Sequence, residues 1–430
     1  MLRSFRIYKI AVLFCRSFVQ FGQKSTTAPD QQTSTMSNST EGSSETRARR
    51  KTIPARPQVS TSLWSIVKNC IGKELTKIPM PVTFNEPLSF LQRLTEDLEY
   101  SVLLDQAAEV EDSCEQLCYI AAYAISCYST TGNRTTKPFN PLLGETFEHN
   151  RPDLGWRSLA EQVSHHPPCT AHHANGKKWT MFQDFTMASR FRGKYLSVTP
   201  SGHTHVAFNS SNNHYTYHKV TTTVHNIIVG TLWIDNHGEV TVENHATGDK
   251  CILKFHTYSY LSPNKARKVY GVVKDARGNA RFVVQGHWDK FVEIAKVTRQ
   301  SSNNVETEQF VRIWSIHSPI PGSEKMYNFT KLAIELNEDE DRVAPTDSRK
   351  RPDQRLMEQG KWDEANREKE RLEQHQREVA AQAAANGIEQ KPAWFEKRQD
   401  PLTGDIYHMF TSEYWQCKKN QDWSRCPAIF

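Results

Sequence analysis

Two adjacent histidines give the clearest chemical signal in this chain. His165 and His166 follow an apolar–polar run and precede Pro167 and Pro168. Proline restrains its own φ and disfavours helix in the residue before it, so the pair is expected where a strand ends at a rigid bend. Side chains alternate faces along a strand, so the two imidazoles can share a ligand only at such a bend. A nearby phosphate would raise an imidazole pKa and keep it charged, which makes an anion the expected ligand.

Further basic residues lie far away in the sequence. Lys137 precedes a proline, and Lys369, Glu373 and Arg377 follow one another at four-residue spacing in a charged segment. Four residues turn a helix by about 400°, so these three side chains share one face. We expect Glu373 to hold both bases in place, with Arg377 contacting phosphate oxygens in bidentate fashion and Lys369 acting as a point charge.

Each of these patterns also has a simpler structural interpretation. A histidine pair before prolines is often a satisfied structural pair, and a charged helix face is often just solvated. Zinc is a further alternative for the pair together with His172 and His173, but adjacent histidines rarely bind one metal. No metal and no cofactor are predicted.

Composition limits the classes of protein. A net charge of +6 over 430 residues suits an anionic membrane surface and is too small to indicate nucleic-acid binding. The nine cysteines include no C-x-x-C pair, so they predict neither a disulfide framework nor a zinc site, and reduced thiols in the cytoplasm are expected. No run of 18 apolar residues is present to span a bilayer.

The periodicity predicts a mainly β protein with flanking helices. Residues 24–60 have the composition of a disordered tail. An apolar stripe from Leu63 to Leu75 predicts an amphipathic helix, and further helices are expected over 88–100, 109–128 and 363–385. From Trp156 onward apolar and polar residues alternate with a period of two, as is typical of strands. Strands are expected at 179–185, 194–198, 214–225, 227–234, 239–243, 252–260, 268–274, 281–286, 292–297 and 311–316.

Short strands with tight turns indicate an antiparallel sheet or barrel rather than alternating strands and helices. Hairpin turns are expected at Asn175-Gly176, at 236–238 and at 277–279. The aromatic-rich segment from Trp394 to Phe430 is too apolar for a free tail, so we expect it to dock on the main domain.

The octapeptide around the histidines resembles the signature of the oxysterol-binding protein family. It consists of Glu161, Gln162, Val163, Ser164, His165, His166, Pro167 and Pro168. The segment from Lys137 to Phe147, which contains Asn140 and Glu145, resembles a second lipid-site motif of the family. Segments 223–230 and 344–349 are similar to family sequences as well, and the resemblance extends from about Ser62 to Phe430.

This resemblance implies an incomplete antiparallel β-barrel around a hydrophobic tunnel, closed by an N-terminal lid helix. It implies a tail over 1–61 and a lipid-binding domain over 62–430. The domain would comprise a lid at 62–80, helices at 81–130, the barrel at 131–335 and a C-terminal subdomain at 336–430. In the family, the residues that hold the phosphatidylinositol 4-phosphate headgroup match Lys137, Asn140, His165, His166, Lys369, Glu373 and Arg377. The lid and the sterol tunnel are expected to use Leu63, Trp64, Ile66, Val67, Ile71 and Tyr128. Ordinary core packing stays open as an alternative for the lid stripe, and as an equal alternative for Tyr128.

The implied function is exchange of sterol or oxysterol against phosphatidylinositol 4-phosphate between membranes. The protein would be cytoplasmic and peripheral on endoplasmic reticulum or Golgi membranes. The family's two-phenylalanine motif for an endoplasmic reticulum receptor is not visible before Ser62. A sterol-responsive signalling adaptor would use the same residues and stays open. A phosphoinositide phosphatase is disfavoured because the sequence has no C-x5-R loop and no G-x-S-x-G elbow, so we expect no enzyme.

Overall fold

The computed structural model describes residues 48–56, 80–259, 265–301 and 304–430, and from Ala48 onward these belong to one compact unit. The expected lid residues Leu63, Trp64, Ile66, Val67 and Ile71 lie outside the described residues. Among those described, no helix is both long and apolar enough to cross a bilayer.

One sheet of fifteen strands dominates the structure, and its named pairings are antiparallel. It does not close into a regular barrel: the strand order runs from β16 back through β15–β10 to β7 and then β6–β3, with β17 on β15 and with β8 and β9 bridging β6 and β11. The strands are β3 (Thr146–Arg151), β4 (Trp156–His165), β5 (Pro168–Asn175), β6 (Trp179–Phe191), β7 (Leu196–Ser201), β8 (His203–Phe208), β9 (His214–His218), β10 (Thr221–His225), β11 (Trp233–Asn244), β12 (Lys250–Phe255), β13 (Lys268–Lys274), β14 (Ala280–His287), β15 (Phe291–Gln300), β16 (Val305–Thr307) and β17 (Val311–Ser315).

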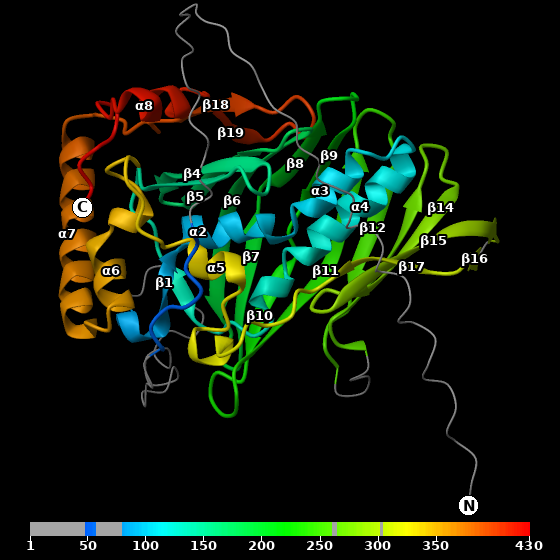
Figure 1. Cartoon of the computed structure of the whole chain (residues 1–430), viewed down its shortest axis with the longest axis horizontal. Helices are drawn as coiled ribbons and strands as arrows, with labels where there is room; N and C mark the ends of the chain where they lie inside the picture. Colours follow the sequence, from blue (N-terminus) through cyan, green and yellow to red (C-terminus); the bar gives the residue numbers. More distant parts are fainter. Residues whose placement is uncertain (1–47, 57–79, 260–264, 302–303) are drawn as a thin grey trace, which may run out of the picture. The chain divides into compact units, whose positions relative to one another are not determined.

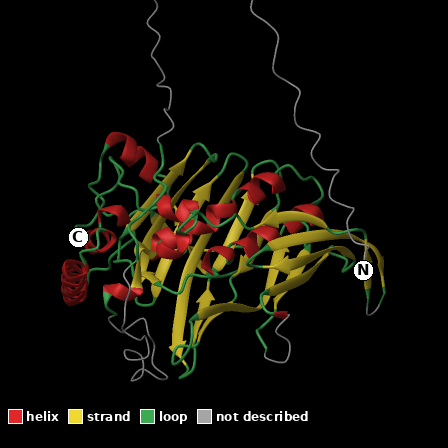
Figure 2. Cartoon of the chain, turned by 60° about the horizontal axis from the view of Figure 1, so that its bottom comes forward, coloured by secondary structure: helices red, strands yellow, loops and turns green. Residues whose placement is uncertain are grey.

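Helices lie across one face of this sheet (Figure 2). The central one, α4 (Ser113–Ser126), packs against β11–β14, and eleven of its side chains are buried. Asp112 caps its N-terminus, and the Asp112 side chain accepts a hydrogen bond from the backbone of Glu115. Before it come α2 (Phe90–Thr95), with a capping box at Ser89, and α3 (Val102–Ala107). Together with buried strand residues, α3 and α4 form the largest apolar core among the described residues.

The segment that carries the predicted basic helix lies at one end of the sheet (Figure 1). Helix α7 (Trp362–Ala385) packs beside α6 (Pro352–Glu358), and α5 (Lys331–Glu335) precedes both. A small parallel pair, β1 (Asn85–Ser89) and β2 (Lys137–Phe139), lies close to them. The chain ends in the hairpin β18 (Phe395–Gln399) and β19 (Ile406–Phe410), followed by α8 (Tyr414–Asn420). The buried Trp394, Phe395 and Tyr414 confirm the expected docking of this aromatic segment.

Several expectations about local structure need correction. The turn expected at 236–238 lies inside strand β11, and the strand expected at 227–234 begins only at Trp233. Residues 48–56, expected in the disordered tail, pack on the domain instead. Arg49 pairs with Glu338 at 3.0 Å, and Ile53 is buried in a core cluster. Composition missed this segment because a few contacts, not overall hydrophobicity, attach it.

Candidate functional site

A single cavity brings the three predicted basic segments together. Its volume is about 670 Å³, and it lies between α7, the turn from β4 to β5, the β2 segment and the C-terminal residues. All seven residues expected at an anion site line it, namely Lys137, Asn140, His165, His166, Lys369, Glu373 and Arg377. Among the described lining residues Glu373 is the one carboxylate, so the cavity is strongly cationic.

The two histidines occupy a tight hairpin. Strand β4 ends at His165, strand β5 starts at Pro168, and these two residues pair across the hairpin. The His166–Pro167 peptide bond is cis. The two imidazole centroids are 4.7 Å apart, with His165 half-buried and His166 exposed. The turn therefore presents adjacent side chains to the same cavity, as the proline pattern predicted.

His165 is connected to the basic helix through Gln376, which the sequence interpretation did not select. The Gln376 amide nitrogen lies 2.8 Å from His165 Nε2, and its oxygen accepts a hydrogen bond from the Leu143 backbone at 2.8 Å. Burial, followed by the charge of His166, lowers the pKa of His165 to about 4. His165 is therefore neutral near pH 7 when no anion is bound.

Helix α7 places its three expected residues at the cavity, but Glu373 does not hold both bases. Its carboxylate pairs with Lys369 at 2.5 Å. Arg377 instead donates from Nε and Nη2 to the side-chain oxygen of Gln374, at 3.1 Å each. The guanidinium is exposed, so helical spacing alone could not show that a neighbouring amide competes for it.

Lys137 reaches the cavity from strand β2 rather than from an isolated corner. β2 runs parallel to β1, with Lys137 opposite Asn85, whose side chain donates to the Pro138 carbonyl at 3.1 Å. Burial lowers the pKa of Lys137, and the nearby charge of Lys369 lowers it further. The site thus holds cations close together without enough negative charge to neutralise them.

Glu145 supports the cavity wall from behind. Its buried carboxylate accepts hydrogen bonds from the Leu142 backbone at 3.0 Å, from Ser348 at 2.6 Å and from Arg351 at 2.9 Å. Arg351 also donates to the Asn140 carbonyl at 2.8 Å. The motif acid therefore fixes the loop that carries Asn140.

The remaining residues of the histidine motif have similar supporting roles. The Glu161 carboxylate accepts from the backbone of Ala393 at 2.7 Å and of Trp394 at 3.0 Å. Gln162 lines the cavity, and its amide donates to the Ser164 carbonyl at 2.8 Å. Val163 is buried in the core beneath the C-terminal hairpin.

The cavity has more polar lining than the sequence predicted. Besides Gln376, it includes Asn85, His375, Lys391 and Arg425. Residues 424–429 also line it, and the side chain of Pro427 lies 3.0 Å from where a Cβ on Gly144 would be. No sequence spacing relates these positions, because the fold alone brings the C-terminal segment to the loop at Gly144.

Tyr128, expected at the sterol end of a tunnel, belongs to the main apolar core. Its hydroxyl accepts a hydrogen bond from the Val220 backbone at 2.8 Å, and its ring meets Phe255 edge-on at 5.1 Å. Burial raises the pKa of this phenol far above its ordinary range. These contacts describe a well-packed tyrosine, and a role toward sterol stays a prediction.

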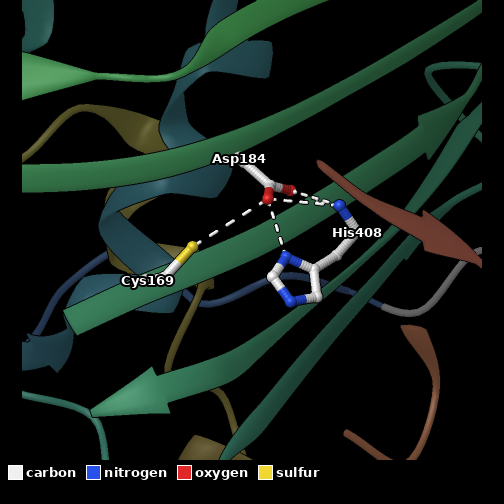
Figure 3. Close-up of side chains that lie close together, drawn as sticks. All are labelled: Cys169, Asp184 and His408. Atoms are coloured by element: carbon white, nitrogen blue, oxygen red, sulfur yellow. Dashed lines mark hydrogen bonds and ion pairs between the residues drawn. The ribbon is translucent and has the colours of Figure 1, made fainter. Parts of the chain in front are cut away.

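A second cluster of titratable side chains, which are of the types that bind metals, lies away from the cavity. Cys169, Asp184 and His408, from β5, β6 and β19, point toward one another (Figure 3). Asp184 accepts from the backbone N–H of His408 at 3.1 Å and lies 2.7 Å from its Nδ1, and Cys169 Sγ is 3.9 Å from the same carboxylate. Burial raises the pKa of Cys169 to about 12, so its thiol is protonated. The Asp184–His408 contacts attach the C-terminal hairpin to the sheet.

The chain matches known proteins over most of its length. The sequence model described as "Oxysterol-binding protein" matches residues 62–419. Mouse oxysterol-binding protein 2 is 53% identical over 404 residues, covering 89% of this chain and 44% of that protein. Oxysterol-binding protein homolog 2 of Saccharomyces cerevisiae is 39% identical over 397 residues, covering 87% and 30%. The chain thus spans less than half the length of these curated relatives.

Solved structures agree with the sequence matches. The Osh1 ORD domain in complex with ergosterol has a TM-score of 0.83 at 37% identity, covering 90% of this chain and 95% of that one. The Saccharomyces cerevisiae Osh3 ORD in complex with PI(4)P has a TM-score of 0.75 at 31% identity, covering 89% and 99%. The matched family is named for lipid binding, in agreement with the prediction that the chain is not an enzyme. The chain belongs to the oxysterol-binding protein family.

Proposed function

We propose that this chain binds a sterol or oxysterol and, in competition with it, phosphatidylinositol 4-phosphate, and that it exchanges the two between membranes. The observation that carries this proposal is the meeting of seven predicted residues from three distant segments around one cationic cavity. Relatives of the same fold are described in complex with ergosterol, with cholesterol and with PI(4)P.

The chemistry of the cavity fits a phosphorylated headgroup. Lys137, Lys369 and Arg377 supply positive charge, and His166 at the exposed turn supplies a further donor. Arg377 can release Gln374 to form a bidentate contact with phosphate oxygens, since that hydrogen bond is solvent-exposed. Bringing cations together while burying Lys137 is costly without a ligand, and an anion offsets this cost. The same charges give no advantage to a neutral lipid headgroup.

The sterol part of the proposal follows from the family and from the physics of transfer. Exposing apolar surface to water costs about 25 cal/mol per Å², so a sterol leaves a membrane slowly on its own. A tunnel closed by the helix expected at 62–80 would lower that barrier. If the acyl chains of the phosphoinositide fill the same tunnel, a gradient of that lipid can drive sterol transport. The setting would be cytoplasmic, at anionic membrane surfaces of the endoplasmic reticulum and Golgi.

Competition between the two lipids tests the proposal directly. A fluorescent sterol is bound to the purified chain, and vesicles of phosphatidylcholine with or without phosphatidylinositol 4-phosphate are added. We expect only the phosphoinositide vesicles to displace the sterol. We also expect sterol transfer to be faster when the donor vesicles hold sterol and the acceptor vesicles hold phosphatidylinositol 4-phosphate. Sterol transfer that ignores the phosphoinositide would contradict exchange. Ligand-dependent recruitment of a protein partner without transfer would favour the adaptor, and release of phosphate would favour an enzyme.

A further inference from the structure

The orientation of the Gln376 side chain is set by a donor that cannot change. The backbone N–H of Leu143 can only donate, and it lies 2.8 Å from Gln376 Oε1. Flipping the amide would place its NH₂ against this N–H, leaving two donors face to face. The amide oxygen therefore points to Leu143, and the NH₂ must point to His165.

This orientation determines the proton position on His165. The Gln376 NH₂ donates to His165 Nε2 at 2.8 Å, so Nε2 must carry a lone pair. A neutral imidazole then holds its proton on Nδ1. That Nδ1 atom is buried and has no hydrogen-bond partner among the described residues. The ring is thus held in a tautomer that leaves one donor unsatisfied.

Most of the charges around the His165 ring also favour its neutral form. His166 beside it and Arg351 behind it disfavour a positive charge, and Glu373 on α7 is the one group facing it that favours protonation. Glu373 is itself paired with Lys369 at 2.5 Å. The remaining titratable lining groups of the cavity are the basic Lys137, His375, Arg377, Lys391 and Arg425 and the thiol of Cys426, whose pKa burial raises.

We propose that Gln376 is a positioning residue of this site, which holds His165 neutral while the cavity is empty and must release Nε2 before that atom can donate to a phosphate oxygen. The second half of this statement rests on the proposed phosphoinositide function, and the first half does not. On release, Nε2 takes a proton from solvent and donates it in a hydrogen bond to the anion, with Nδ1–H retained. Headgroup binding is therefore coupled to uptake of about one proton by His165.

The tautomer is measurable in the protein without any lipid. Long-range ¹H–¹⁵N correlation spectra of the ¹⁵N-histidine-labelled chain report which ring nitrogen of His165 is protonated. We expect Nδ1–H in the native chain. Gln376→Glu presents a carboxylate that accepts from Nε2, so we expect its proton on Nε2. Gln376→Leu should lose the preference for Nδ1–H.

Gln382→Glu is the matched control for this experiment. Gln382 lies on the same helix, is exposed and does not line the cavity, so its spectrum should keep Nδ1–H on His165. A His165 ring that carries its proton on Nε2 in the native empty chain would overturn the proposal. So would an unchanged tautomer in both Gln376 variants that remain folded.

Calorimetry in buffers of different ionisation enthalpy then tests the coupling. Binding to vesicles that contain phosphatidylinositol 4-phosphate should take up about one proton near pH 7. The affinity for these vesicles should therefore fall by up to about tenfold for each unit by which the pH is raised. His165→Gln should remove this uptake. Phosphoinositide binding without proton uptake would overturn the coupling alone. Failure of the native chain to bind phosphoinositide would overturn the proposed function, while the spectra would still decide the role of Gln376 in the empty site.

Discussion

Glu161 accepts a hydrogen bond from the backbone N–H of Trp394 at 3.0 Å, across more than half of the chain. The same carboxylate accepts from Ala393, so one acid of the histidine hairpin anchors the start of the C-terminal aromatic segment. Residues 390–392, which line the cavity, directly precede this anchor. Glu161 thus acts on the site by positioning the segment 390–392, and it does not itself line the cavity.

The burial of Glu161 predicts a pH dependence of stability. Burial raises its pKa from 4.5 to about 7, so between these values the folded state binds more protons than the unfolded state. The contribution of Glu161 to the free energy of unfolding therefore falls as pH rises from about 4.5 to about 7, by about 3 kcal/mol in total. Urea unfolding at several pH values should show this slope in the native chain and a reduced slope in Glu161→Gln. Equal slopes in both proteins would refute this assignment.

The histidine pair predicts a ligand-selective loss of binding. His165→Ala combined with His166→Ala should weaken binding to phosphatidylinositol 4-phosphate vesicles by about 100-fold, at about 1.5 kcal/mol for each lost hydrogen bond to a charged group. Sterol binding should stay largely intact. The control is His256→Ala, whose ring lies away from the cavity. Equal loss of both ligands would indicate unfolding instead of a headgroup site.

Lys137 predicts opposite effects on stability and binding. Its pKa is lowered mainly by burial, so the charged form costs stability in the folded chain. Lys137→Met removes that charge and keeps most of the side-chain volume, and we expect a higher thermal unfolding temperature near pH 7. Phosphoinositide affinity should fall at least about tenfold, which corresponds to about 1.4 kcal/mol. A variant that is less stable, or that binds phosphoinositide normally, would show that Lys137 has another role.

Replacing Glu145 should lower the free energy of unfolding by a large amount. Glu145→Leu leaves the Leu142 N–H without its acceptor and removes one of the two carboxylates that pair with Arg351. Breaking a buried pair of this kind costs about 3–5 kcal/mol, measurable as the free energy of unfolding in urea. Glu370→Leu is the comparison, since Glu370 is exposed on α7 and should change stability by less than about 0.5 kcal/mol. A difference below about 1 kcal/mol between the two variants would contradict the supporting role.

Much of the β architecture could be predicted because alternation persists along its strands. The strand expected at 268–274 matches β13, and the turn at Asn175-Gly176 lies between β5 and β6. The failure at 236–238 has a physical reason. Gly238 carries a φ of 129°, which glycine tolerates inside a strand, so a sequence typical of a turn continues β11 instead.

The residues of the candidate site could likewise be predicted only in part. Charged residues at regular spacing or beside prolines were identifiable, and the fold brings them together. Gln376 was not, because glutamine in a charged helix gives no signal until Leu143 and His165 are placed on either side of it. The prediction that Glu373 holds Arg377 was wrong for a related reason. Helical spacing allows both Glu373 and Gln374 as neighbours, and only the side-chain conformation decides between them.

Helix α7 is 24 residues long, yet only Ala365 and Leu372 among its side chains are buried. Nearly every other position faces solvent or the cavity, so the helix can accept substitutions without disturbing the apolar core. Lys369, Glu373 and Arg377 all belong to this element. Under the proposed function, substitutions on α7 would alter three of the seven headgroup residues and leave the fifteen-stranded scaffold as it is.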